Sequence, residues 1–134
     1  MLAAFVCPTL LAMLLSAAPD EKLLVPAGFA RQDITPTYPV RLSGFGFRRT
    51  ESEGVQQRVW AKAMVLGHDQ PLVLVTVDNL GCSLAIRQQL LERLKTQGVT
   101  AERFAIAASH THTAPMLEGV CPTLFGQPIP PDHM

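Results

Sequence analysis

Pro71-Leu72-Val73-Leu74-Val75-Thr76-Val77-Asp78 is the stretch that decides the fold. It contains three valines and one threonine, which are β-branched, and no glycine, a composition typical of a buried β-strand. A second apolar run, Val59–Leu66, precedes it, and the residues Gly67-His68-Asp69-Gln70 between them have the composition of a hairpin turn. We therefore expect two neighbouring antiparallel strands.

A helix and another strand follow. Ser83 is suited to cap a helix that runs to about Gln97, and Gly98 is suited to stop it. Apolar residues recur at helical spacing and predict a buried face: Leu84, Ile86, Leu90, Leu91 and Leu94. The next apolar run, Arg103–Ala108, predicts a strand, and a strand–helix–strand unit favours a parallel pair.

An earlier strand is expected over Ala27–Asp33, because Thr35-Pro36 would end it. The predicted fold class is therefore α/β, with a mixed sheet and one main helix. The chain has 134 residues, enough for one domain. Its 48% hydrophobic and 16% charged residues indicate a globular protein.

The charge balance argues against a nucleic-acid partner. Eleven basic residues match eleven acidic ones, and no basic patch stands out. Arg48 and Arg49 are offset by Glu51 and Glu53, so we expect a solvated loop there.

The first residues have the composition of a secretory signal peptide. Leu2–Ala18 is almost wholly apolar, and Ser16 and Ala18 are the small residues that a signal peptidase prefers. A buried helix or a membrane anchor is the alternative, although Pro8 interrupts the run. We expect a signal peptide over residues 1–18, a secreted or periplasmic location, and a domain over 19–134 with an irregular proline-rich tail from 122.

Cleavage after Ala18 would remove Cys7 and leave two cysteines. Cys82 and Cys121 could then form a disulfide in an oxidising compartment, or both could be free thiols, which the sequence favours.

Ser109-His110-Thr111-His112-Thr113-Ala114-Pro115 holds the candidate site. Side chains two residues apart on an extended chain share a face, so His110 and His112 could both reach one metal ion. A surface loop without a ligand is the alternative. Asp78 ends the neighbouring strand, where it could orient an imidazole or simply belong to a turn. Glu118 could be an acid, a base or a ligand, but a solvated carboxylate is favoured.

Five segments, in order, resemble the neutral/alkaline non-lysosomal ceramidase family, N-terminal portion of the catalytic domain. The resemblance covers roughly Ala27 to Pro115. Its segments are Gly28–Pro36 (family G-x-x-x-x-D-I-T), Leu42–Gly46, Arg58–Ala63 (R-x-x-A-[RK]-A), Val75–Asp78, and Ala107–Pro115, which resembles an SHTHSGP-type signature.

The resemblance implies a zinc amidase that cleaves ceramide to sphingosine and a fatty acid, with possible contact with a membrane surface. It implies that His110 is a zinc ligand and that His112, beside the metal, contacts the substrate or moves a proton. Thr113 and Ala114 stand where the family has Ser-Gly. The family's other zinc ligands lie well downstream, so we expect part of a larger α/β catalytic domain. The alternative is a secreted, non-catalytic remnant that keeps the fold.

Overall fold

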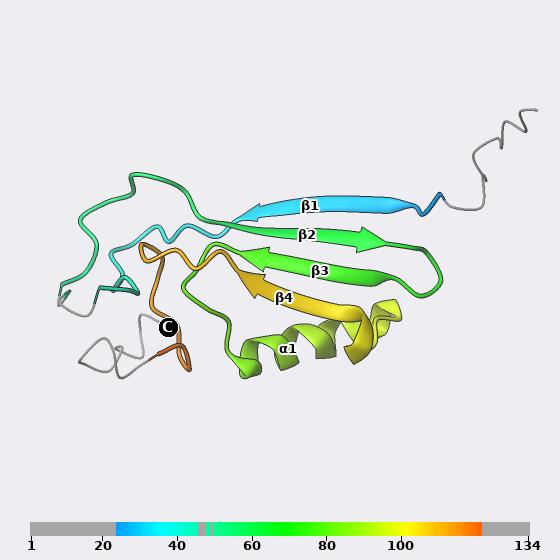
Figure 1. The fold of residues 1–134 in the computed structure, drawn as a ribbon. Coiled ribbons are helices and arrows are strands. Elements are labelled where there is room, and N and C mark those ends of the chain that lie inside the picture. Colours follow the sequence, from blue (N-terminus) through cyan, green and yellow to red (C-terminus); the bar gives the residue numbers. More distant parts are fainter. Residues whose placement is uncertain (1–23, 46–47, 49, 122–134) are drawn as a thin grey trace, which may run out of the picture.

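The computed structural model describes residues 24–45, 48 and 50–121 (Figure 1). It contains a four-stranded sheet, one α-helix and two short 3-10 helices. The elements are β1 (Ala27–Asp33), β2 (Trp60–Leu66), β3 (Leu72–Val77), α1 (Leu84–Leu94), η2 (Lys95–Gln97), η3 (Ala101–Arg103) and β4 (Phe104–Ala108). The expected signal peptide, Cys7 and the tail from 122 lie outside the described residues. Within those residues, no helix has the length and apolar character needed to cross a membrane.

The sheet has the order β1-β2-β3-β4. The strands β2 and β3 form the expected antiparallel pair, and β3 and β4 form the expected parallel pair. The strand β1 pairs antiparallel with β2 at an edge of the sheet, a position that the sequence alone left open. The mixed α/β sheet with one main helix is confirmed.

The main core lies between α1 and one face of the sheet. Its buried residues are Val73 and Phe104 from neighbouring strands together with Leu91 and Val99. Ser83 caps α1 by accepting a hydrogen bond from the Ile86 N–H, as expected. The prediction that Leu84 is buried is wrong: it is 66% exposed. The core contacts the second half of α1, so the first turn lies beyond it.

One half of the opposite face of the sheet is apolar and partly exposed. The register brings Phe29 beside Met64 and Met64 beside Leu74, and it pairs Leu66 with Leu72. We call these five residues the open face. Phe29 is 77% exposed and Leu72 is 41% exposed, so the described part of the chain leaves apolar surface in water here.

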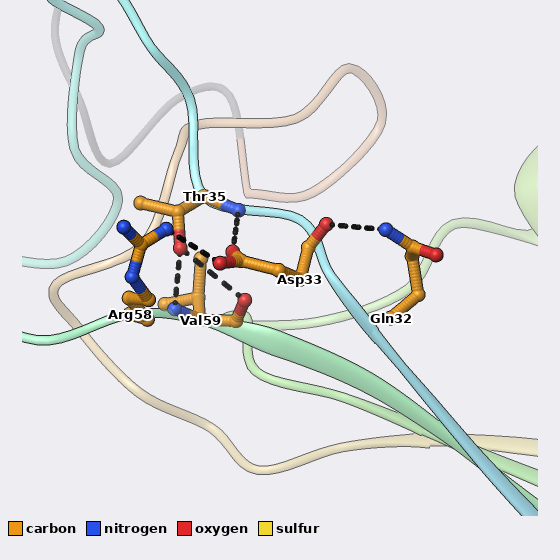
Figure 2. Close-up of polar contacts among 5 residues, drawn as sticks. All are labelled: Gln32, Asp33, Thr35, Arg58 and Val59. Carbon is orange, nitrogen blue, oxygen red and sulfur yellow. Dashed lines mark hydrogen bonds and ion pairs between the residues drawn. The ribbon is translucent and has the colours of Figure 1, made fainter.

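A polar cluster holds the end of β1 against the start of β2 (Figure 2). The Asp33 carboxylate accepts a hydrogen bond from the Thr35 N–H at 2.9 Å and pairs with Arg58. The Thr35 hydroxyl oxygen accepts one from the Val59 N–H at 2.9 Å. Hydrogen bonding from Thr35, first through its side chain and then through its backbone, lowers the pKa of Asp33, with a smaller effect of Arg58.

The loops that carry the candidate site gather at one end of the sheet. The carboxyl ends of β1, β3 and β4 lie at that end, on the left of Figure 1. The segments that follow β3 and β4 therefore leave the sheet next to each other, as expected for adjacent parallel strands.

Candidate active site

His110 and His112 meet just after β4. Their Nε2 atoms are 3.3 Å apart, and their ring centroids are 4.9 Å apart with the planes at 74°. The reason we gave for this meeting is wrong, because His110 is not extended: its φ is +61°. The chain turns sharply at His110 through the left-handed region, which is costly for a residue with a β-carbon.

The two imidazoles differ in how they are held. The His110 Nδ1 lies 2.9 Å from the carbonyl oxygen of Leu80. A carbonyl can only accept, so this nitrogen carries the proton and the neutral ring has its lone pair on Nε2. The contact between the two Nε2 atoms then requires His112 to be the donor. One histidine therefore presents a lone pair and the other presents an N–H.

His112 is held by the loop that follows residue 41. The Arg48 guanidinium donates a hydrogen bond to the His112 carbonyl oxygen at 2.7 Å and lies 4.8 Å from the centre of the Phe45 ring. That ring in turn meets the His112 ring edge-on at 5.4 Å. The expectation of a solvated loop is wrong at Arg48, because its side chain is half-buried against the candidate site.

Backbone pairing fixes this loop against the histidine segment. The Ser43 N–H and hydroxyl both donate to the Ala114 carbonyl oxygen, at 2.8 and 3.1 Å. Both residues are almost wholly buried. Leu42 forms a β-bridge with Pro115. The position of His112 is thus set by a segment some seventy residues earlier in the chain.

The segment after β3 supports His110 from the other side. Asn79, which is 4% exposed, accepts a hydrogen bond from the Leu80 N–H at 2.7 Å and donates one to the Pro115 carbonyl at 2.9 Å. Asp78 accepts a hydrogen bond from the Trp60 N–H at 3.0 Å. Asp78 was expected to orient an imidazole through one of its ring nitrogens. At His110 that nitrogen contacts the Leu80 carbonyl instead, and the role of Asp78 stays a prediction.

Imidazole nitrogens are ligands that zinc accepts, and the two Nε2 atoms lie at a distance that zinc could bridge. Two imidazole nitrogens that bind one zinc ion at about 2.0–2.1 Å lie at most about 4.2 Å apart, so a separation of 3.3 Å allows them to share an ion. Among the described residues, no group of three or more His, Cys, Asp or Glu side chains could hold a metal. The described residues therefore form no complete metal site.

The other sequence candidates lie apart from the pair. Glu118 is exposed, as favoured, and His68 lies in the turn before β3, where its side chain is 91% exposed beside Asp69. Cys82 and Cys121 are both free thiols, and partial burial raises the pKa of Cys82.

A hollow of about 720 Å³ lies next to the histidine segment. The loop between β1 and β2 forms most of its wall, and Thr113 and Pro115 close it. Neither His110 nor His112 lines it. The pair therefore lies outside this hollow, next to Thr113 of its wall.

Sequence reasoning missed four supporting residues: Gly44, Phe45, Arg48 and Asn79. The sequence singles out Leu42–Gly46, which contains Gly44 and Phe45, as part of the family resemblance. A glycine beside an aromatic residue in a polar loop was the available signal for a close backbone approach. The contacts of Asn79 and Arg48 join segments that are distant in the sequence, and no local sequence pattern predicts them.

Comparison with known proteins found one matching family and similar solved structures. The sequence profile of the family described as neutral/alkaline non-lysosomal ceramidase, N-terminal, matches residues 26–122. The crystal structure of neutral ceramidase from Pseudomonas aeruginosa is similar over 69% of this chain, with 30% identity and a TM-score of 0.61. A ceramidase complexed with C2 is similar over 69%, with 31% identity and a TM-score of 0.58.

These similarities cover only 16% and 15% of the two solved chains. The chain thus corresponds to about a sixth of either structure. No curated protein sequence matches it.

Proposed function

Because this chain belongs to the neutral/alkaline non-lysosomal ceramidase family, we propose that it supplies part of the catalytic site of a zinc-dependent amide hydrolase. The reaction adds water across the N-acyl bond of a lipid amide such as ceramide and yields sphingosine and a fatty acid. The observation that carries the proposal is the inequivalence of the two histidines, with the His110 Nδ1 against the Leu80 carbonyl.

His110 and His112 take different roles in this proposal. The Nε2 lone pair of His110 holds zinc. Zinc held there would supply Lewis-acid chemistry, lowering the pKa of a water molecule and polarising the amide carbonyl. The Nε2–H of His112 faces the His110 Nε2 in the structure, and with zinc on that nitrogen it would be free to reach a substrate oxygen or the departing amine nitrogen. It binds the substrate or passes a proton to the leaving group, which becomes the amine.

Further ligands must complete the zinc site, since the described residues supply only the pair. The similarity covers about a sixth of the solved ceramidases, and we propose that residues beyond the matched region provide them. The second candidate is a non-catalytic remnant, which keeps this fold and hydrolyses no amide.

Export places such an enzyme at its lipid substrate. We propose that residues 1–18 are removed as a signal peptide and that the remaining chain is secreted or periplasmic, with contact at a membrane surface. The N-terminal residue of the exported product tests this: Pro19 is expected, and an intact Met1 on the exported chain contradicts it.

Amide hydrolysis by the zinc-loaded chain tests the proposal. The chain, extended by the residues that complete the zinc site, is incubated with a short-acyl ceramide, and the released sphingosine is measured for wild type, His110→Ala, His112→Ala and the control His68→Ala. We expect the control to match wild type, His110→Ala to lose both zinc and turnover, and His112→Ala to keep zinc but lose turnover at least about 100-fold. Zinc binding without hydrolysis by wild type supports the remnant instead, and a folded chain that binds no zinc contradicts the zinc enzyme.

A further inference from the structure

We infer that Asn79 is a positioning residue that fixes the tautomer of His110 through the carbonyl group of Leu80. Asn79 is the second residue after β3, and its side chain is buried although it carries two polar atoms. Such a side chain is tolerated only when both atoms are hydrogen-bonded, and here both are.

The Asn79 side chain makes one hydrogen bond within its own loop and one across to the histidine loop. Its oxygen accepts from the Leu80 N–H at 2.7 Å, which fixes the peptide next to the one that carries the Leu80 carbonyl. Its amide group donates to the Pro115 carbonyl at 2.9 Å, just beyond the histidine segment. Asn79 therefore fixes the peptide before the Leu80 carbonyl and ties that loop to the loop after β4 on the far side of the histidine turn.

The backbone completes the same link. The carbonyl oxygen of Val77, the last residue of β3, accepts hydrogen bonds from the Asn79 N–H at 3.0 Å and from the Ser109 N–H at 2.9 Å. His110 begins its left-handed turn directly after Ser109. The distance of 2.9 Å between the His110 Nδ1 and the Leu80 oxygen thus depends on how these two loops are joined.

The consequence for chemistry is which nitrogen of His110 has the lone pair. With Leu80 in place, Nδ1–H donates and Nε2 is free to bind a metal ion. Without this link, Leu80 can move away, and the ring loses its preference for that tautomer. The tautomer of His110 is a property of the metal-free chain. The inference rests on the proposed function only where it takes the His110 Nε2 as the nitrogen that binds zinc.

Long-range ¹H–¹⁵N NMR of the metal-free full chain measures the tautomer of His110 directly. We expect wild type to be mainly the Nδ1–H form and Asn79→Ala to lower the ratio of the Nδ1–H to the Nε2–H form about fivefold. Ser43→Ala is the matched control: its hydroxyl is equally buried and donates to the same histidine segment at Ala114, but does not touch Leu80. It should leave the ratio unchanged.

Asn79→Asp provides a second test if Asn79→Ala does not fold. It keeps the oxygen that accepts from Leu80 and loses the donor toward Pro115, so a smaller fall in the ratio is expected. A folded variant of either kind with the wild-type ratio overturns the inference, as does an equal fall in Ser43→Ala. Absence of zinc binding by wild type would count against the proposed function and leave this result unaffected.

Discussion

Gly44 and His112 approach so closely that no side chain fits between them. A β-carbon built on Gly44 would lie 2.4 Å from the β-carbon of His112 and 2.6 Å from its Nδ1. The φ of Gly44 is +76°, in the left-handed region. This backbone conformation is a second reason why glycine is favoured at this position. The loop before β2 thus forms one wall of the place that His112 occupies.

Gly44→Ala should both destabilise the chain and displace His112. The backbone conformation alone costs about 1–2 kcal/mol, and the contact with the imidazole adds to this, so we expect a loss of about 3 kcal/mol or more. Gly98→Ala is the control, because Gly98 has a similar φ of +77° with nothing within 4 Å. Chemical denaturation measures both. Equal losses in the two variants would show that the contact with His112 costs nothing.

Arg48→Ala should loosen His112 at a modest cost in stability. The lost hydrogen bond to the His112 carbonyl lowers the free energy of unfolding by about 1–2 kcal/mol, and the NMR signals of the His112 ring should shift. Arg103→Ala removes a similar bond, to the Gln70 carbonyl at 2.8 Å, far from the histidines. It should leave the His112 signals in place. Unchanged His112 signals in Arg48→Ala would contradict the role given to Arg48.

The strands and the helix could be predicted because their signals are local. The valine-rich run before Asp78, the cap at Ser83 and the stop at Gly98 each depend on near neighbours in sequence, and the structure has elements there. The surroundings of the histidines could not be predicted in the same way. Arg48 and Asn79 donate hydrogen bonds to carbonyl groups 64 and 36 residues away. Every residue has a backbone carbonyl group, so the residue type at those positions does not reveal the contact.

The contact between His110 and His112 could also be predicted only in part from the sequence. An extended chain would also have placed both rings on one face, so the expectation was useful although its reason was wrong. The left-handed turn at His110 is imposed by contacts of the two loops that hold it. Histidine adopts a positive φ more often than most residues with a β-carbon but still only in a minority of cases, so the pattern of the motif alone did not indicate it.

Asp33 should make the free energy of unfolding decrease as the pH falls into the acidic range. Its pKa is lowered in the fold, so the carboxylate stays charged there at a pH where the unfolded chain, with a value near 3.8, takes up a proton. Its contribution is therefore complete above that value and lost as pH falls through the lowered pKa of the folded chain.

Asp33→Asn should reduce the loss of stability between about pH 5 and about pH 2 that wild type shows in chemical denaturation. Asp69→Asn, in the exposed turn before β3, is the control and should follow wild type. If Asp33→Asn retains the full wild-type loss on acidification, the cluster in Figure 2 does not act as described.

The isolated chain should self-associate through the open face and the edge strand β1. Phe29 lies on both and is 77% exposed. Exposed apolar surface and an unpaired edge each favour association. Light scattering at rising concentration should show association of wild type, and Phe29→Lys should reduce it.

Leu84→Lys is the control for this association. Leu84 is 66% exposed but lies on α1, which packs on the other face of the sheet. It should leave the association of wild type unchanged. A wild-type chain that stays monomeric at every concentration would contradict the prediction.

Zinc titration of the full chain, followed at the ring nitrogens of both histidines by NMR, tests the central claim most directly. We expect the His110 Nε2 signal to move as a ligand nitrogen while its Nδ1 keeps its proton, and we expect binding to survive His112→Ala but not His110→Ala. His68→Ala should change nothing. Zinc binding that is lost in His112→Ala and kept in His110→Ala would contradict the assignment of His110 as the metal ligand.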